Sequence, residues 1–496
     1  MVVDFGASGG KCFAGTFEGD AFKMEEIHRF AHEGVSFFAN DSSGEMSERT
    51  YWNDIYLYDN IIKGLQAYKR DFADTLDSIG IDTWGADGQF VTADGDILGK
   101  VYCYRDHRLD DMIDQVKSKI DPKRVYEITG IHFQPFNLSN QLLWFMQNRK
   151  QTLQDGATYL PVPALFYYYL GGIKKVDSSW ASVTQLMDAA SKEWSAEMLE
   201  ALGIPSEIMP EIVAPGTAVG ELLKPIADMV GLNQAQLTAV GSHDTASAFA
   251  AAPVENVDDA LIISSGTWSL VGKLVPEPIT NEAAMNFGLS NEGGIGNVRL
   301  LKNCMGTWLV QELIRDWTVQ DGKETSWKIL DQETVDAPAF TAFLDVDDPT
   351  FYNPASMEAA VIDFCKKTGQ DVPATRGTFL RVVYESLAMK YRVIKEGIRD
   401  ITGKDSNVVN IVGGGTKNVM LNQYTANAIG VPVKAGPVEG TAVGNFMVQA
   451  LGLGIIDKIE DALPIIRNSF PINEYEPQDT AAWDEAYARY QQVVSG

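Results

Sequence analysis

The sequence lacks several features that define large classes of proteins. It has only four cysteines in 496 residues, with no CxxC pair, so neither a disulfide framework nor a structural zinc site is expected. Long apolar runs are also missing. The most apolar stretch, 160–173, contains two prolines and is shorter than the ~20 residues that a membrane span requires. The start, Met-Val-Val-Asp, shows no secretory signal, and a cytoplasmic location is predicted.

Positive charge is scarce. Forty Lys and Arg residues stand against 67 Asp and Glu, which gives a net charge of −27. A chain this acidic repels phosphate backbones and anionic membranes. We therefore expect a small-molecule substrate, with no nucleic acid and no membrane as partner. A bound nucleotide would have to be held locally, by backbone N–H groups, a few cations and a metal ion.

What is present is an alternation of short β-branched runs with longer helical patterns. A strand is predicted over 78–84, and helices are predicted over 51–68 and 137–146. This alternation is typical of the α/β class. A small-residue helix over 245–252 ends at a proline and a polar connector, after which a new strand begins. We place a domain boundary there, which gives domains 1–252 and 253–496.

Three small-residue turns each follow a buried-type strand. The first is at 6–10 and the second, at 264–269, has the same strand–turn–strand form, so an internal duplication is predicted. The third, Gly413-Gly414-Gly415, leads into a helix over 418–429. None matches the Walker or dinucleotide fingerprints. Ordinary tight turns remain one interpretation. The other is phosphate binding, which the hydroxyls of Ser8 and Thr267 and the cation of Lys11 favour.

Two aspartates are candidates for chemistry. Asp244 precedes a small-residue helix, which is typical of an N-cap. It also falls where the two domains join, where a carboxylate can take the proton of a substrate hydroxyl during phosphoryl transfer. Asp4 ends the first strand. It either accepts turn N–H bonds or orders the water shell of Mg²⁺. The sequence leaves both alternatives open.

The segment 82–87 combines two acids, a tryptophan and a glycine at a strand end. Carboxylates and aromatic faces are the groups that bind sugars, although a packed Trp84 at a strand edge explains the same pattern. His28, His32, His107 and His132 are interpreted as ordinary surface or packing residues.

Taken together, these segments resemble the FGGY family of carbohydrate kinases, and within it the rhamnulokinases. The resemblance covers most of the chain from residue 2 to about residue 450, in family order. The strings that carry it are DFGASGGK at 4–11, SIGIDTWG at 78–85, YRD at 104–106, HDTASA at 243–248, SSGTWSL at 264–270, NEGG at 291–294, LKNCMG at 301–306, VGGG at 412–415 and AGPVE at 435–439.

The resemblance implies two actin-like (ribonuclease H-like) α/β domains around a central cleft and phosphorylation of a ketose by ATP with Mg²⁺. It implies that Asp244 is the catalytic base and that Asp4 is the metal-water carboxylate. The implied ATP-binding residues are Ala7, Ser8, Gly9, Gly10, Lys11, Gly266, Thr267, Gln311, Gly414, Gly415 and Asn418. The implied sugar contacts are Gly85, Asp87, His243, Thr245 and Asn303.

The expected substrate is a 6-deoxy-ketohexose phosphorylated at its C1 hydroxyl, with L-rhamnulose ahead of L-fuculose. Trp84 or Phe90 would supply the apolar surface for its methyl group. Gly88-Gln89 replaces the large apolar residues expected there, so Gln89 is a candidate to read a differently placed hydroxyl. Lys11 and Ala164 are further departures, where the family usually has Arg and Asp.

Other assignments stay open at this point. Within the family these are an L-fuculokinase or another pentulose or polyol kinase. Outside it, an actin-like or chaperone-type ATPase shares the duplicated fold. A sugar-sensing regulator would need a DNA-binding element or a basic face, and the sequence shows neither. A monomer or homodimer is expected.

Overall fold

The computed structural model describes residues 1–40 and 44–495. These residues form two compact units, and each unit draws on three segments of the chain. The first unit comprises 1–251, 274–300 and 440–469, and the second comprises 252–273, 301–439 and 470–496. The two domains predicted in chain order, 1–252 and 253–496, stay a prediction. The compact units do not follow chain order, because short segments from the second half complete the first unit.

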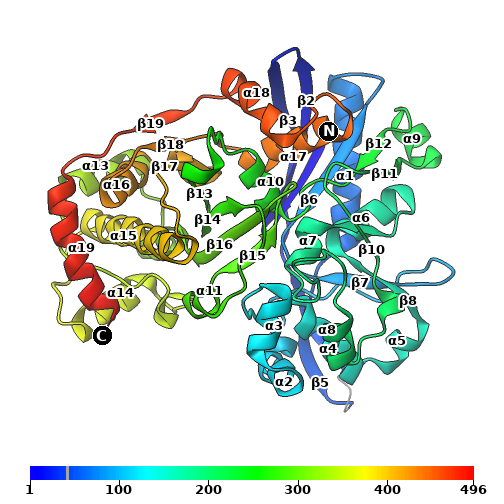
Figure 1. The fold of residues 1–496 in the computed structure, drawn as a ribbon, viewed down its shortest axis with the longest axis horizontal. Helices are drawn as coiled ribbons and strands as arrows, with labels where there is room; N and C mark the ends of the chain where they lie inside the picture. Colours follow the sequence, from blue (N-terminus) through cyan, green and yellow to red (C-terminus); the bar gives the residue numbers. More distant parts are fainter. Residues whose placement is uncertain (41–43, 496) are drawn as a thin grey trace. The chain divides into compact units, whose positions relative to one another are not determined.

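The first unit is built on a six-stranded mixed sheet (Figure 1). β1, β6 and β12 run parallel to one another, while β2, β3 and β11 are antiparallel to their neighbours. β6 is buried along its whole length, as expected for a strand covered on both faces. The order is β11 (Ala218–Glu221), β12 (Gln236–Thr238), β6 (Ser78–Thr83), β1 (Val2–Gly6), β2 (Gly9–Glu18) and β3 (Ala21–Ala31).

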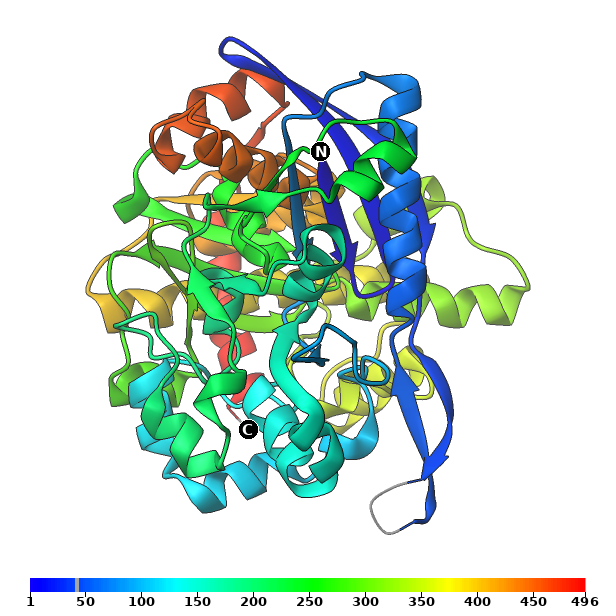
Figure 2. The same ribbon diagram turned by 90° about the vertical axis from the view of Figure 1, so that its right-hand side faces the viewer.

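Helices pack on the faces of this sheet. Figure 2 shows α1 lying along β2 and β3, and Asn53 caps its start by accepting the Tyr56 N–H. The helices of this unit are α1 (Asp54–Asp71), α2 (Met112–Lys119), α3 (Pro122–Thr129), α4 (Leu138–Asn148), α5 (Lys150–Asp155), α6 (Val162–Gly171), α7 (Ser178–Ser182), α8 (Ala196–Leu202), α9 (Lys224–Val230), α10 (Asp244–Ala250), α11 (Glu282–Phe287), α17 (Gly440–Gly452) and α18 (Ala462–Ser469).

Three two-stranded sheets accompany the large one. They pair β4 (Val35–Asn40) with β5 (Met46–Tyr51), β7 (Gly88–Thr92) with β8 (Gly156–Pro161), and β9 (Lys175–Asp177) with β10 (Glu211–Val213).

The seven-stranded sheet repeats the pattern of the first. A tight hairpin, β13–β14, opens it, and β13, β17 and β18 run parallel with an antiparallel edge strand beyond them. In the six-stranded sheet β1–β2 is the equivalent hairpin. The equivalent parallel strands are β1, β6 and β12, and the equivalent antiparallel edge strand is β11. The predicted internal duplication agrees with this match. The order is β15 (Ser290–Gly293), β16 (Val298–Met305), β14 (Trp268–Val275), β13 (Ala260–Ser265), β17 (Val408–Val412), β18 (Val433–Ala435) and β19 (Asn473–Tyr475).

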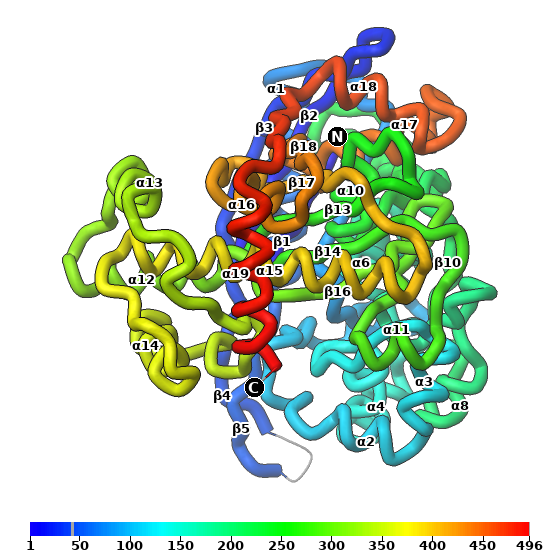
Figure 3. Tube along the Cα trace, turned by 60° about the vertical axis from the view of Figure 1, so that its left-hand side comes forward, coloured from blue at the N-terminus to red at the C-terminus, as the bar shows by residue number. Residues whose placement is uncertain are grey.

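Long helices pack together in the second unit. α15 is capped by Thr375 at its start and ends at Gly403, whose left-handed φ of 70° suits a residue without a side chain. Figure 3 shows α19 alongside α15 and α16. The helices of this unit are α12 (Trp308–Asp321), α13 (Trp327–Asp336), α14 (Met357–Lys367), α15 (Arg376–Thr402), α16 (Val419–Ile429) and α19 (Thr480–Val494).

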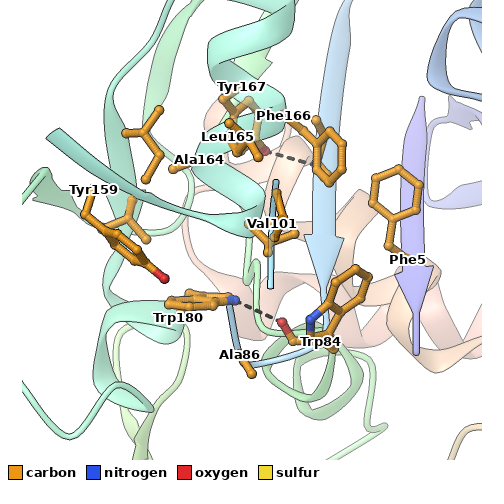
Figure 4. Packing of buried hydrophobic residues seen from close by; sticks show 14 of the residues in the cluster. Phe5, Trp84, Ala86, Val101, Tyr159, Ala164, Leu165, Phe166, Tyr167 and Trp180 are labelled. Carbon is orange, nitrogen blue, oxygen red and sulfur yellow. Dashed lines mark hydrogen bonds between the residues drawn. The ribbon is translucent and has the colours of Figure 1, made fainter. Parts of the chain in front are cut away.

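Several aromatic side chains pack in the core of the first unit (Figure 4). Phe5 packs on Phe166 at a ring distance of 4.8 Å. Tyr167 is buried and bonds both the Ile81 N–H and the Thr238 carbonyl. Trp180 is fully buried, and its indole N–H donates to the Trp84 carbonyl at 3.1 Å. This hydrogen bond from a core residue therefore fixes the backbone at Trp84.

All four cysteines are free and buried. Burial raises the pKa of Cys12 and Cys103 to about 12 and that of Cys365 to about 11, and it raises the pKa of Cys304 as well. Among the described residues, no helix is both long and apolar enough to cross a membrane.

Candidate active site

The parallel strands of the first unit bring their carboxyl ends to one edge of the sheet. Ligands of open α/β sheets bind at such an edge. Asp4 on β1 lies opposite Asp82 on β6 in the strand register. At the end of β6, Thr83 pairs with His243 in a parallel bridge, and the Thr83 N–H donates to the Ser242 carbonyl at 2.8 Å. The topology thus gathers the predicted metal carboxylate and the start of α10, residues 243–245, at one edge.

Asp82 forms a carboxyl pair with Asp4. Asp82 is fully buried. Burial, the charge of Asp4 and a hydrogen bond between the two carboxyls all raise its pKa, while a hydrogen bond from Asn445 opposes the rise. A neighbouring carboxylate disfavours the ionised form of Asp82, in the same direction as its burial. From the sequence Asp82 is recognised only as part of a strand end; its bond from Asn445 on α17 joins residues 363 apart in the chain and has no sequence signal.

Asp244 is not the N-cap of α10. The cap is His243, and Asp244 is the first residue inside the helix. Its Oδ1 accepts the N–H of Thr245 at 2.6 Å, and about a third of its side chain is exposed. Burial raises the pKa of this carboxyl, whereas His243 and Arg299 lower it. The capping interpretation is therefore wrong, and a partly exposed carboxylate is left at the start of a helix.

The imidazole of His243 is held against Gly85. A side-chain carbon at Gly85 would lie 2.8 Å from His243 Nε2, so only glycine leaves room for the ring. The ring also lies 3.5 Å from Asp244 Oδ1 and 3.4 Å from Glu292 Oε2. Gly85, His243 and Asp244, three predicted site residues, thus meet in one place.

A buried ion pair of residues that were not predicted site residues supports the start of α10. Arg299 is fully buried and lies 3.1 Å from the carboxylate of Glu292. Its guanidinium donates to the hydroxyl of Thr245 at 2.9 Å and to the carbonyl of Gly293, also at 2.9 Å. Both charged residues come from the segment 274–300, beyond the predicted domain boundary. From the sequence Glu292 is recognised only within a motif and Arg299 not at all, although a basic residue inside a buried strand is a recognisable signal.

Asp87 is a further carboxylate near this edge of the sheet. It is fully buried in a left-handed backbone conformation with φ of 75°, which is strained for a residue with a side chain. Its Oδ2 accepts the indole N–H groups of Trp52 at 2.6 Å and Trp84 at 3.2 Å, and the backbone N–H of Tyr104. Its Oδ1 has no partner among the described residues. Burial raises the pKa of Asp87 to about 6.

Two expectations for this region need correction. The side chain of Gln89 is buried, its Nε2 donates to the Lys100 carbonyl and its Oε1 accepts the Phe90 N–H. These two bonds hold the amide against the backbone, so it is not the freely placed side chain expected to read a sugar hydroxyl. Phe90 is fully buried against Phe145 and Tyr159, so it cannot line a pocket. Trp84 packs on Trp52 at 4.5 Å and is 5% exposed, and its contact with the sugar stays a prediction.

The glycines of the predicted phosphate turns divide into two kinds. Gly10 and Gly415 are required by packing, because a side chain would overlap the ring of Phe30 and the hydroxyl of Ser265 respectively. Gly414 has nothing within 4 Å of its missing side chain. Gly266 has only one backbone atom, at 3.7 Å. Open backbone suits a close approach by a ligand, so Gly266 and Gly414 are the stronger candidates.

The structure brings Thr267 and Gln311 together in the second unit. The Thr267 hydroxyl donates to Gln311 Oε1 at 3.4 Å, which links the β13–β14 turn to α12. Asn418 has a structural function as well, since it caps α16 by accepting the Leu421 N–H at 2.9 Å. Asn303 lies on β16 in the second unit, and its Oδ1 has no partner among the described residues.

The first of the predicted phosphate turns is short. Gly6 and Gly9 pair across β1 and β2, so Ala7 and Ser8 form its tip, and Lys11 lies opposite Asp4 in the register. Within the described residues there is no group of three His, Cys, Asp or Glu side chains that would hold a metal ion. Magnesium usually keeps several waters and uses one or two carboxylates plus phosphate oxygens. The Asp4 edge fits that coordination.

Comparison with known proteins decides the family. The N-terminal domain model of the FGGY family of carbohydrate kinases matches residues 47–250, and its C-terminal domain model matches residues 261–453. The chain belongs to the FGGY family of carbohydrate kinases. An FGGY kinase is a phosphotransferase that acts on an alcohol group of a sugar, so the protein is an enzyme of that class.

Curated relatives of this FGGY kinase match over the whole chain. A rhamnulokinase of Bacteroides thetaiotaomicron is 36% identical over 495 residues, covering 100% of this chain and 99% of the relative. A rhamnulokinase of Bacillus subtilis is 33% identical and covers 96% and 95% respectively.

Solved structures confirm the mixed α/β sugar kinase fold. A xylulose kinase of Lactobacillus acidophilus aligns with a TM-score of 0.78 at 14% identity, over 100% of this chain and 97% of that structure. A glycerol kinase of Plasmodium falciparum solved with ADP gives the same TM-score, identity and coverage.

Proposed function

We propose that the enzyme transfers a phosphoryl group from ATP to the C1 hydroxyl of a 6-deoxy-ketohexose, with L-rhamnulose preferred over L-fuculose. The observation that carries the proposal is the state of Asp244. Its carboxylate is partly exposed, is not a helix cap, and stands beside a histidine and a buried arginine. The full-length similarity to rhamnulokinases supports this choice of sugar.

Asp244 acts as the base in this proposal. Phosphoryl transfer passes through a loose transition state, so the base mainly orients the substrate hydroxyl and takes its proton late. The Thr245 N–H bonds Asp244 Oδ1 and fixes the direction of the carboxylate. Oδ2 is then the oxygen that faces the sugar hydroxyl.

The sugar is held by the groups around Asp87. Its unpartnered Oδ1 accepts a hydroxyl, and Trp84 offers an apolar face to the C–H groups and the methyl of the sugar. Gly85, His243 and Thr245 complete the predicted contacts in the first unit, and Asn303 is the contact proposed from the second.

The nucleotide phosphates are assigned to Ala7–Lys11 and to the turn of Gly266 and Thr267, and the adenosine to Gly414, Gly415, Asn418 and Gln311. Asp4 would hold Mg²⁺ through its waters, and the ion would neutralise charge on the phosphates. Asp82 keeps Asp4 in place.

The direct test is a coupled ADP-release assay with Mg²⁺-ATP. It compares kcat/KM for L-rhamnulose, L-fuculose, L-ribulose, D-xylulose and glycerol under one set of conditions. We expect L-rhamnulose to rank first. A clear preference for glycerol or D-xylulose would overturn the deoxy-ketose assignment, and a preference for L-fuculose would reverse only the order.

Thr267→Val tests the nucleotide assignment. Losing one hydrogen bond to a charged phosphate costs about 1.5–3 kcal/mol, so we expect KM for ATP to rise ~10- to 100-fold while KM for the sugar holds. Thr267→Ser keeps the hydroxyl and is the matched control. An effect confined to the sugar KM would contradict the phosphate role.

An actin-like ATPase is the alternative of a different class. Such a protein has no use for the buried Asp87 acceptor beside two tryptophans. ATP consumption in the coupled assay that is independent of every added sugar would favour it.

A further inference from the structure

His32 connects the first phosphate turn to the tryptophan pair. It follows β3 directly, and its backbone N–H donates to the Ser8 carbonyl at 3.3 Å. Its ring nitrogen Nε2 lies 2.8 Å from the Gly6 carbonyl. The other side of the ring meets Trp52 at 5.4 Å and Trp84 at 5.7 Å. From the sequence His32 is interpreted as an ordinary surface or packing residue.

The contact with Gly6 fixes the tautomer of the ring. A carbonyl oxygen only accepts hydrogen bonds, so Nε2 of His32 must carry the hydrogen. In a neutral imidazole Nδ1 is then an acceptor. Burial lowers the pKa of His32, with a further contribution from the nearby Arg105 cation, while the Gly6 bond opposes the shift. The ring is therefore neutral at physiological pH.

His32 Nδ1 is buried and has no hydrogen-bond partner among the described residues. A buried acceptor without a donor is unfavourable, and the great majority of such groups are satisfied. The same holds for Oδ1 of Asp87, whose other oxygen binds the indole N–H groups of the same two tryptophans. Two unsatisfied acceptors thus adjoin one aromatic pair.

We propose that His32 is a specificity-determining residue whose Nδ1 accepts a hydrogen bond from a substrate hydroxyl, while Asp87 Oδ1 accepts one from another. The ligand that fits two acceptors beside an aromatic face is a polyol with hydroxyls on one side and C–H groups on the other. This inference rests on the proposed sugar kinase function and names the protein atom that reads a second hydroxyl.

Two substitutions separate this role from a purely structural one. The amide of asparagine can place its oxygen near the position of Nδ1, whereas the amide of glutamine reaches the position of Nε2. His32→Asn therefore keeps the acceptor and loses the bond to Gly6. His32→Gln keeps the bond to Gly6 and loses the acceptor.

The variants are compared by steady-state kinetics on the best sugar, with thermal melting as the folding control. We expect His32→Gln to lose ~10²-fold in kcat/KM for the sugar with KM for ATP unchanged, and His32→Asn to stay within about tenfold of the wild type. A site built to bond a hydroxyl rejects an analogue that lacks it. One monodeoxy analogue should therefore be rejected by the wild type and not by His32→Gln.

The opposite pattern overturns the inference. If His32→Gln behaves like the wild type, or if His32→Asn alone loses activity, the imidazole only tethers the turn. Equal losses in both variants, accompanied by lower melting temperatures, also assign it a structural role. The inference is also overturned, with no variant needed, if the wild type uses every monodeoxy analogue as well as the parent sugar.

Failure of the proposed function is recognised separately. A wild type that phosphorylates no sugar of the panel overturns the kinase substrate assignment. The sugar affinities of the wild type and both variants, measured by calorimetry, then test the role of His32. Weaker binding by His32→Gln than by His32→Asn supports the role, and the opposite order contradicts it. If no sugar binds the wild type, both proposals are overturned.

Discussion

Asp244 lies at the start of α10, where an aspartate usually caps the helix, but here the cap is His243. The carboxylate of Asp244 is therefore available to a substrate. Asp244→Asn keeps an oxygen that can accept the Thr245 N–H but removes the proposed base. Loss of a general base typically lowers turnover ~10²–10⁴-fold, so we expect kcat to fall by that factor while ATP still binds. The measurement is kcat together with nucleotide affinity. Near-normal kcat with a lowered melting temperature would assign the residue to helix stability.

Asp87 should couple stability to pH. Its pKa of about 6 in the folded protein lies above the ordinary value of 3.8, so the folded state holds more protons between these values. Stability then falls as pH rises through this window, by about 1 kcal/mol between pH 5 and pH 7. Asp87→Asn keeps an oxygen for the three donors and has no such titration.

We expect the stability of Asp87→Asn relative to wild type to increase from pH 5 to pH 7 in denaturant titrations. The variant also turns the free acceptor into a donor, so its KM for the sugar should rise ~10-fold or more. A stability difference that does not change with pH would contradict the raised pKa. An unchanged sugar KM would remove Asp87 from the sugar site.

Motifs locate some of these residues from sequence and not others. Asp244 and Asp87 stand in segments where small residues, acids and an aromatic combine, so they were predicted. Arg299 and Asn445 were not, because each acts through a contact between segments that lie far apart in the chain. No sequence pattern indicates that His32 Nδ1 and Asp87 Oδ1 lack hydrogen-bond donors, because hydrogen bonding between distant residues depends on how the chain packs.

At the scale of elements, α10 and α17 approach very closely. A side chain on Gly444 would overlap the carbonyl oxygen of Ser247, so the two helix backbones touch there. We expect Gly444→Ala to destabilise the protein by about 1–3 kcal/mol, the usual range for overpacking. Gly414→Ala, where the space is open, should change stability by less than about 1 kcal/mol. Equal melting temperatures for both variants would contradict this packing.

The sequence predicts the presence of these helices more accurately than it predicts their first and last residues. The helix expected over 51–68 is Asp54–Asp71, and the helix expected over 137–146 is Leu138–Asn148. Apolar periodicity finds the body of a helix, but capping decides its ends, as Asn53 does for α1. The helix expected from Asn418 begins at Val419, because a 3₁₀ turn over Gly414–Lys417 occupies the glycine segment and Asn418 is the cap.

The whole molecule is divided differently from its order in the chain. The first unit needs 274–300 and 440–469, which supply Arg299 and the helix α17. We expect a fragment of residues 1–252 to lack cooperative unfolding and to be digested rapidly by protease, because α10 and β6 lose their cover. Far-UV circular dichroism and limited proteolysis check this. A stable fragment with a sharp transition would support the chain-order domains instead.

The buried thiols have a practical consequence for labelling experiments. A maleimide reacts with the thiolate, and burial keeps all four native cysteines protonated and covered. A cysteine introduced at an exposed position would then be the reactive one, with no need to remove the others. Fluorophore or spin-label pairs placed on the two units would report the distance between them in solution, with and without substrates, in an otherwise native protein.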